Sequence, residues 1–159
     1  LTYIGPFSVK FQLEKVKEHI KDALDKGAQL IGGKIFKING KGYFIESGVL
    51  TNVNHSMRIM KKETFGPLTP IMKFKTIDEA IKLANDSEYG LTASIWTQDI
   101  KLGQEIARKI EAGTVEINRH GMSKTGCPWG GYKKSGIGRI YSKEGIRSFC
   151  NTKHIWVVK

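Results

Sequence analysis

Cysteine is scarce in this sequence. Its 159 residues include only Cys127 and Cys150, too few for the disulfide scaffold of a small secreted domain. We therefore expect a reducing, cytoplasmic setting in which each thiol is buried or incidental. Neither cysteine stands in a Cys-x-x-Cys or Cys/His pattern, so no metal site is expected.

Long apolar runs are also lacking. The sequence has no stretch of about 18 apolar residues, which argues against a transmembrane helix and a membrane partner. Residues Leu1 to Pro6 include no initiator Met, no charged n-region and no cleavage site, so we expect no secretory signal. We expect a fragment: a cloned piece, a proteolytic product or the product of a split gene.

Acidic residues are few. The 15 Asp and Glu residues stand against 26 Lys and Arg residues, which gives a formal net charge of +11. A basic nucleic-acid binder is one interpretation. However, the lysines are spread along amphipathic segments and interleaved with acids, and no recognition helix or aromatic RNA-binding motif accompanies them. We therefore expect no nucleic-acid partner.

Hydrophobic periodicity predicts the elements of the first half. Residues 13–26 have a helical apolar stripe (Leu13, Val16, Ile20 and Leu24), and Gly27 suits the position that ends a helix. Residues 29–31 read as a short strand. Asn39-Gly40 predicts a tight turn before the strand-like residues 43–45, and residues 48–53 continue as an extended segment.

The second half alternates strands and helices. We predict strands at 68–75, 91–97 and 114–118. A capping box at Thr76–Glu79 opens a helix with Ile77, Ala80, Ile81 and Ala84 inside and Tyr89-Gly90 at its end. Asp99 caps the next helix. This rhythm favours a parallel α/β sheet. A short helix at 142–149 and a terminal strand at 154–158 complete the chain.

Two motifs carry a resemblance. Glu63-Thr64-Phe65-Gly66-Pro67 is followed, after two helices and two strands, by the glycine-rich stretch Pro128 to Arg139. Further landmarks stand in order at 42–45, 85–93 and 112–118. Together they resemble the carboxyl-terminal part of an NAD(P)-dependent aldehyde dehydrogenase. The resemblance covers nearly the whole chain.

The resemblance implies a fold and a division of the chain. It implies an α/β parallel-sheet sandwich with helices on both faces, like the C-terminal part of the family's catalytic domain. Residues 1–142 would be a partial catalytic domain. Residues 143–159 would be a short helix and strand that serve oligomerisation, with the last strand pairing to a neighbouring subunit.

The resemblance also implies a chemistry that this chain does not complete. The family oxidises an aldehyde through a covalent adduct on a cysteine, transfers hydride to NAD(P) and hydrolyses the thioester. It places the cysteine, the general base and the dinucleotide-binding domain before the segment that matches. We therefore expect no catalytic residue here, no dehydrogenase activity from the chain alone, and weak or absent binding of NAD or NADP.

Cofactor and substrate contacts can be assigned by resemblance. Glu63 would accept hydrogen bonds from the nicotinamide ribose and Phe65 would lie beside the nicotinamide; the alternatives are a surface acid and a core residue. Trp129 would face the substrate tunnel or be plain core. Arg119, His120 and Met122 would also line the tunnel, and Arg119 could pair with a substrate carboxylate or simply be solvated.

Smaller features complete the prediction. Gly130, Gly131, Gly136 and Gly138 are expected to need positive φ or close packing. Ile140 stands where the family commonly has an acid, which puts one salt bridge in doubt. A non-catalytic oligomerising or regulatory module is the main alternative function. Expected partners are a second copy of the chain and a separately encoded amino-terminal half.

Overall fold

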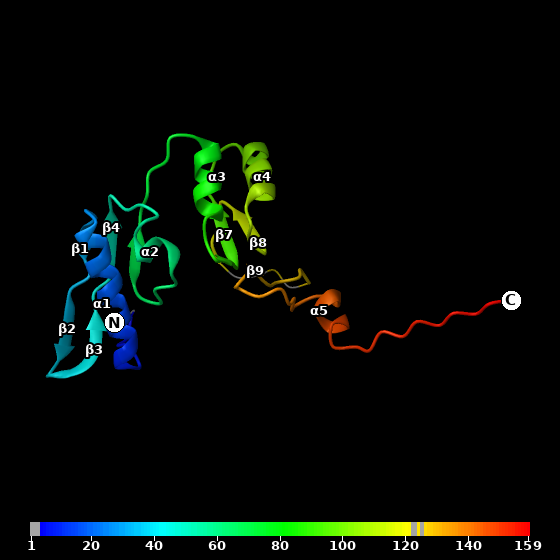
Figure 1. The fold of residues 1–159 in the computed structure, drawn as a ribbon, viewed down its shortest axis with the longest axis horizontal. Coiled ribbons are helices and arrows are strands. Elements are labelled where there is room, and N and C mark those ends of the chain that lie inside the picture. Colours follow the sequence, from blue (N-terminus) through cyan, green and yellow to red (C-terminus); the bar gives the residue numbers. More distant parts are fainter. Residues whose placement is uncertain (1–3, 122–123, 125) are drawn as a thin grey trace. The chain divides into compact units, whose positions relative to one another are not determined.

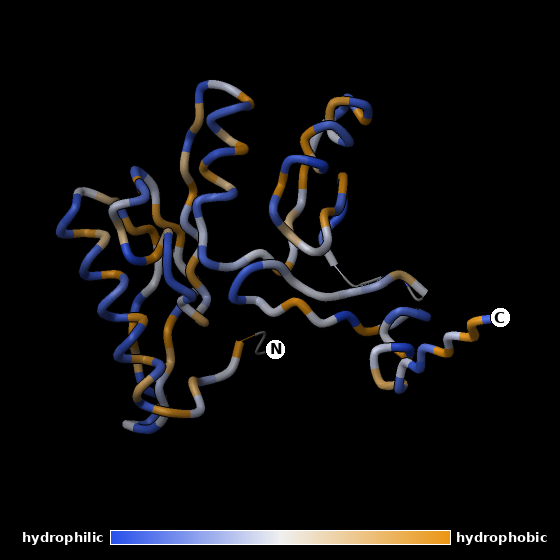
Figure 2. The backbone as a smooth tube through the Cα atoms, turned by 45° about the vertical axis from the view of Figure 1, so that its right-hand side comes forward, coloured by the Kyte–Doolittle hydropathy of each residue, from blue (hydrophilic) through white to orange (hydrophobic). Residues whose placement is uncertain are grey.

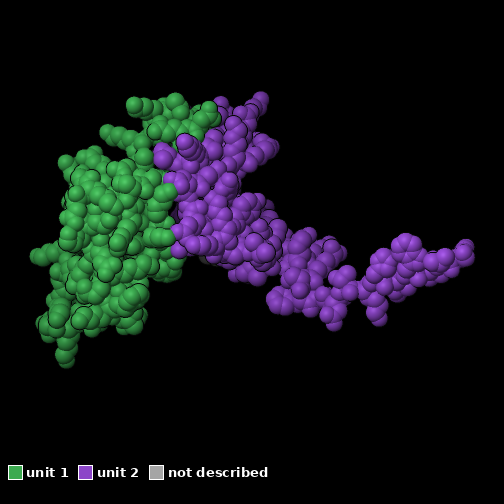
Figure 3. All heavy atoms as spheres, in the orientation of Figure 1, with its two compact units in different colours: residues 1–79 green, residues 80–159 purple. Residues whose placement is uncertain are grey.

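The computed structural model describes residues 4–121, 124 and 126–159. The chain divides into two compact units, a first unit that ends at Glu79 and a second unit from Ala80 to Lys159 (Figure 3). This division differs in kind from the expected one at 142/143, which stays a prediction.

The first unit combines two helices with two small sheets (Figure 1). Its elements are α1 (Lys10–Asp25), β1 (Gln29–Gly32), β2 (Ile35–Ile38), β3 (Lys41–Ile45), β4 (Gly48–Thr51), α2 (Arg58–Lys61) and β5 (Leu68–Pro70). One sheet has the order β1-β4-β5, with β1 antiparallel and β5 parallel to β4. The other is the β2–β3 hairpin.

The predicted turn at Asn39-Gly40 is confirmed. Both residues have positive φ, 50° and 74°, and they join Ile38 to its register partner Lys41. Positive φ at both central positions is typical of the two-residue turn that fits the right-handed twist of a hairpin.

Helix α1 forms where the apolar stripe predicts it, but it begins three residues earlier. Leu13, Val16 and Ile20 are buried as expected, whereas Leu24 is 44% exposed, so its place on the inner stripe was wrong. Gly27 has φ +92°, which confirms that it follows the helix in the left-handed conformation.

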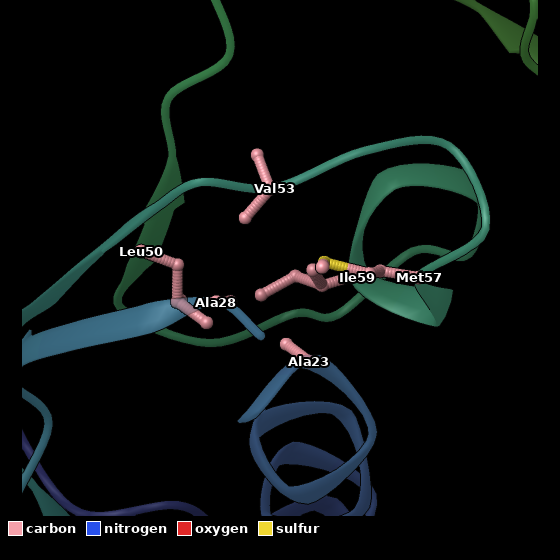
Figure 4. Packing of buried hydrophobic residues seen from close by; sticks show 6 residues of the cluster. All are labelled: Ala23, Ala28, Leu50, Val53, Met57 and Ile59. Carbon is pink, nitrogen blue, oxygen red and sulfur yellow. The ribbon is translucent and has the colours of Figure 1, made fainter. Parts of the chain in front are cut away.

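The buried core of the first unit lies between α1, α2 and the three-stranded sheet. Figure 4 shows Ala23 on α1, Leu50 on β4, and Met57 and Ile59 at α2 converging in one cluster. Leu50 and Met57 are fully buried. Burying such side chains contributes roughly 1.5–3 kcal/mol each. A second cluster is formed by Val16 and Ile20 of α1 and Ile45 of β3.

The second unit is built around a parallel strand pair. Helix α3 (Ile77–Asn85) crosses the division between the units. The remaining elements are β6 (Tyr89–Gly90), β7 (Thr92–Ile95), α4 (Ile100–Lys109), β8 (Thr114–Ile117), β9 (Tyr132–Lys133) and α5 (Lys143–Arg147). Strands β7 and β8 pair in parallel, joined by α4, and β6 pairs antiparallel to β9. The α/β class is confirmed, with parallel pairs at β4–β5 and β7–β8.

Side-chain caps begin the helices of this half, and those of α3 and α4 were predicted. The Glu79 amide donates to Thr76 Oγ1 (3.2 Å) and its carboxylate accepts from the amide of Lys75 (2.7 Å), a close variant of the expected box. Asp99 Oδ1 accepts from the Leu102 amide at 3.0 Å. Ser142 Oγ accepts from the Gly145 amide at the start of α5.

Three predicted elements need correction. The strand expected at 68–75 ends at Pro70, because the hydrogen bonds to β4 end with the Ile71 amide on Leu50 O. Tyr89-Gly90 does not end a helix but forms β6. Residues 151–159 have no secondary structure, so within the described part of this chain the expected terminal strand has no partner.

The second unit has little side-chain core. Every buried hydrophobic side chain in the described ranges belongs to the first unit. The described residues of the second unit that are buried are all glycines: Gly90, Gly103, Gly130, Gly131 and Gly145. Helix α3 buries none of its residues, although its apolar stripe is clear. The end of the chain likewise leaves apolar residues unburied, since residues 155–158 lie in an extended tail (Figure 2).

Candidate functional site

The Glu63–Pro67 loop, which joins α2 to β5, is fastened to helix α1. Gln12 Nε2 donates to the backbone oxygens of Thr64 (2.6 Å) and Phe65 (2.9 Å). The side chain of Thr64 faces the same helix, with its Oγ1 2.9 Å from His19 Nδ1. Three hydrogen bonds from one helix face therefore hold the middle of the loop.

His19 is only 4% exposed. It lies between Val16 and Ile20 on the inner face of α1, and a polar ring in that place needs a hydrogen-bonding partner. Burial lowers the pKa of His19, and the positive charges of Lys15 and Arg58 lower it further, against the smaller opposing effects of Asp22 and Glu18. The imidazole is therefore neutral at neutral pH.

The residues on either side of Thr64 face outward. Glu63 is exposed, and Phe65 is 72% exposed with φ +49°. A bulky aromatic residue rarely adopts the left-handed region, and residues held there cluster at ligand-binding positions. The alternative that Phe65 is a core residue is wrong. The exposed carboxylate of Glu63 remains compatible with both of its interpretations.

The carboxyl-terminal end of the loop is also fixed. At Gly66, an added Cβ would lie 2.8 Å from Val16 Cγ2, so the backbone passes close to α1. Downstream, the Leu68 amide donates to Gly66 O (2.8 Å) and the Gly48 amide donates to Pro67 O (2.9 Å). The loop thus presents an acceptor-only carboxylate and a rigid ring from an anchored backbone, which is what a ribose hydroxyl pair and a flat heterocycle require.

In the second unit, Arg119 and His120 follow the end of β8. Both are exposed. Arg119 Nε lies 3.5 Å from a carboxylate oxygen of Glu116, and His120 Nδ1 lies 3.3 Å from Ser94 Oγ on β7. The guanidinium therefore already has a carboxylate neighbour, and its pairing with a substrate acid stays a prediction.

Trp129 is half-buried. Its backbone pairs with that of Ile140 through hydrogen bonds of 2.9 and 2.8 Å, and its ring lies 6.4 Å from the Tyr141 ring at 46°. It is not fully buried core, and its place in a substrate tunnel is untested.

Close backbone packing orders the glycine-rich stretch. An added Cβ at Gly130 would lie 2.0 Å from Gly138 O, and one at Gly131 would lie 2.6 Å from Ser135 Cβ. Gly136 has φ +94°. These three confirm the prediction, but Gly138 does not, because its φ is not in the left-handed range and nothing lies within 4 Å of an added Cβ.

The side chain of Arg139 holds this stretch by hydrogen bonds to its backbone, and position 140 offers no acidic partner. Its Nη1 donates to the carbonyls of Gly131 (3.0 Å), Ile137 (3.0 Å) and Gly138 (2.9 Å), and its guanidinium lies 5.8 Å from the centre of the Tyr132 ring. Backbone oxygens thus accept hydrogen bonds from Arg139 Nη1, with Ile140 in place of the acid that is common in the family.

The predicted site residues fall into two sets. Glu63 and Phe65 share one loop of the first unit, whereas Arg119, His120 and Trp129 belong to the second unit; Met122 lies outside the described residues. The sequence reasoning missed Gln12 and His19. Their signal was a helical face: positions 12, 16 and 19 recur at four- and three-residue steps.

Other expectations can be checked on the described residues. Cys127 and Cys150 are both exposed, so of the two expected alternatives, a buried or an incidental thiol, the buried one is wrong. Within the described ranges, three or more His, Cys, Asp or Glu side chains nowhere gather as metal ligands, and no helix is both long and apolar enough to cross a membrane.

One pocket of the first unit lies away from the Glu63–Pro67 loop. It has a volume of about 580 Å³. Its lining residues are Ile4, Lys34, Phe36, Ile45, Glu46 and Ser47. None of the predicted site residues lines it.

Comparison with known proteins gives a consistent result. A model of the aldehyde dehydrogenase family matches residues 1–155. An aldehyde dehydrogenase of Enchytraeus buchholzi is 42% identical over 154 residues, which are 96% of this chain and 31% of that protein. A putative aldehyde dehydrogenase of Staphylococcus saprophyticus is 42% identical over 97% of this chain and 33% of that protein.

Solved structures agree. The betaine aldehyde dehydrogenase of Staphylococcus aureus in complex with NAD+ matches with a TM-score of 0.89 and 41% identity, over 97% of this chain and 31% of that one. The NAD+ complex of a Bacillus cereus aldehyde dehydrogenase matches with a TM-score of 0.88 and 40% identity, over 98% and 32%. This chain spans about a third of the length of these relatives.

Proposed function

Since the chain belongs to the aldehyde dehydrogenase family, we propose that it supplies the wall of an NAD(P)-dependent aldehyde dehydrogenase site that holds the nicotinamide and borders the substrate entrance. The observation that carries the proposal is the loop fastened through Thr64, with Glu63 and Phe65 exposed on either side of it.

The residues fit a nicotinamide nucleotide. Glu63 would accept hydrogen bonds from two hydroxyls of the ribose, because a carboxylate offers two acceptor oxygens. The ring of Phe65 would limit the swing of the nicotinamide, and its unusual φ of +49° keeps it outside the core. Bound NAD(P) would supply the hydride acceptor, and proximity of that acceptor to the substrate carbon removes much of the reaction barrier.

Taken alone, the chain would not oxidise aldehydes. It spans about a third of its relatives, and the resemblance assigns none of its residues to the nucleophile or the general base. Its affinity for NAD+ or NADP+ would be weak, since the pyrophosphate and adenosine contacts belong to the dinucleotide-binding domain.

The test is reconstitution. The chain is assayed for aldehyde-dependent NADH or NADPH formation alone, and then co-expressed with the part of the Staphylococcus aureus betaine aldehyde dehydrogenase that precedes the matched segment. Activity is expected only from the assembled pair. Aldehyde oxidation by the pure chain would refute the proposal of inactivity.

A charge-neutralising variant tests the role of Glu63. In the assembled pair, Glu63→Gln is expected to weaken NAD+ binding about tenfold or more, because hydrogen bonds to charged groups contribute roughly 1.5–3 kcal/mol. Glu105→Gln is the matched control, since Glu105 is an exposed acid on α4. Equal affinity in the two variants would contradict a ribose contact at Glu63.

A second candidate is a non-catalytic oligomerising module. It is favoured by residues Ile155 to Val158, which are 77–80% exposed in an extended segment, and by the apolar stripe that α3 leaves unburied. An extended edge of this kind can add a strand to a second copy. Light scattering on the chain with and without residues 151–159 separates a dimer that depends on this segment from a monomer.

A further inference from the structure

We infer that His19 is a positioning residue for the cofactor contact: through its hydrogen bond to Thr64 it sets the orientation of the loop that carries Glu63 and Phe65. The inference rests on the proposed function, in which those two side chains contact the nicotinamide nucleotide. His19 would act through Thr64, without touching the cofactor itself.

The burial of His19 is the first observation. In the part of the chain that the structure describes, His19 is the one polar or charged side chain that is buried. An apolar residue on the same stripe would fill this place without needing a partner. The ring is instead matched to one hydroxyl, Thr64 Oγ1 at 2.9 Å, which lies in the loop and not in the core.

The position of Thr64 is the second observation. Its side chain turns inward to His19, while the residues on either side of it, Glu63 and Phe65, are exposed. Gln12 donates to the backbone oxygens of residues 64 and 65, whereas the hydrogen bond of His19 goes to a loop side chain. The His19 bond is therefore the contact that defines which way the loop side chains face.

Charge around His19 favours this bond at neutral pH. Burial and the nearby positive charges of Lys15 and Arg58 lower the pKa of His19, while Asp22 and Glu18 raise it by less. A neutral imidazole can share a hydrogen bond with a hydroxyl in either tautomer, because one ring nitrogen donates and the other accepts. The pair needs no counter-ion in the buried position.

Two substitutions of His19 distinguish a residue that positions the loop from one that only fills space in the core. His19→Leu fills a similar volume and removes the polar atom. His19→Asn keeps a polar atom bonded to Cγ, at the place of Nδ1, with a smaller side chain. On the partner side, Thr64→Val replaces the hydroxyl by a methyl group of the same shape.

Two measurements on the full chain report the effect. Hydrogen exchange is measured at the amides of Gly48 and Leu68, which bond to Pro67 O and Gly66 O in the loop, and at the amide of Ile71, which bonds to Leu50 O outside it. Separately, NAD+ is titrated at millimolar concentration while the NMR signals of the Glu63 and Phe65 amides are followed.

In His19→Leu and Thr64→Val we expect exchange at Gly48 and Leu68 to accelerate about threefold to tenfold, the factor that matches loss of one ordinary hydrogen bond. Ile71 should change less, and the NAD+-induced shifts should require about threefold to tenfold more NAD+. The double variant His19→Leu/Thr64→Val should show no further change. His19→Asn should have most of the slow exchange and of the NAD+ response of the unmodified chain.

Contrary results are equally clear. If His19→Leu leaves loop exchange and the NAD+ titration unchanged, the inference fails. It also fails if Ile71 accelerates as much as Gly48 and Leu68, or if Asn does not restore what Leu removes, because His19 would then be a core residue only. Equal NAD+ affinity of Glu63→Gln and Glu105→Gln in the assembled pair would count against the proposed function, while the exchange data would still decide the positioning of the loop.

Discussion

Gly66 offers a sharp test of how tightly the Glu63–Pro67 loop is held against α1. The substitution Gly66→Ala adds one methyl group that would lie 2.8 Å from Val16 Cγ2 and 3.5 Å from Phe7 Cζ. The φ of Gly66 is outside the left-handed region, so the cost comes from crowding. Val16 is fully buried, and a β-branched residue in a helix has essentially one rotamer, so it cannot turn away.

The expected cost follows from overpacking. Forcing an extra methyl group into a filled site typically costs about 1–3 kcal/mol. In a unit of fewer than 100 residues, each kcal/mol lowers the unfolding midpoint by about 4–8 °C. Because the other side of the contact is the loop backbone, part of the displacement should reach Phe65 and weaken the contact that we propose between Phe65 and NAD+.

Removing the opposing methyl groups should relieve the crowding. Val16→Ala alone costs about 2 kcal/mol, from two buried methyl groups and the cavity that they leave. In the double variant Gly66→Ala/Val16→Ala, the new methyl group occupies part of that cavity. We expect the double variant to be about 1 kcal/mol or more better than the sum of the single changes, as close neighbours couple.

The assay must report on the first unit. The three tryptophans, at positions 96, 129 and 156, all belong to the second unit, so their fluorescence is not suitable. Hydrogen exchange at buried amides of β4 gives the stability of the first unit directly. A Gly66→Ala variant as stable as the parent chain, or strict additivity in the double variant, would refute the contact between loop and helix.

Three further outcomes are expected. The folded-state pKa of His19 is lowered from 6.5, so its contribution to stability is complete above pH 6.5 and is lost as the pH falls through the folded pKa; urea titrations should show this loss, and His19→Leu should lack it. Gly113→Ala would place a Cβ 1.8 Å from Gly130 O and should destabilise the second unit by about 3 kcal/mol or more, whereas Gly138→Ala, with open space around it, should be neutral by tryptophan fluorescence. Leu50→Ala empties a fully buried site and should cost about 2–5 kcal/mol by hydrogen exchange in β4.

Local patterns predicted the elements that depend on local forces. The Asn39-Gly40 turn and the caps at Thr76 and Asp99 were correct, because a turn or a cap depends on residues a few positions apart. Strand lengths were less predictable. Residues 71–75 have a suitable pattern, but a strand extends only as far as its neighbour offers hydrogen bonds, and β4 offers none beyond Leu50 O.

The same limit applies to burial. The stripe on α3 correctly marked an amphipathic helix, yet none of its residues is buried, since a stripe shows which face can be covered and not what covers it. For the same reason the sequence could not tell that Cys127 and Cys150 are exposed or that Leu24 lies outside the core.

The motif Glu63-Thr64-Phe65-Gly66-Pro67 illustrates the division between sequence and structure. The sequence by itself determined the family, because ordered motifs survive in the chain as residues that can be read directly. Only the tertiary structure decided how the motif is held, with Thr64 turned toward His19 and Phe65 turned out at positive φ. The contact between Thr64 and His19 joins residues 45 positions apart, and such a pairing is created by packing, not by any local pattern.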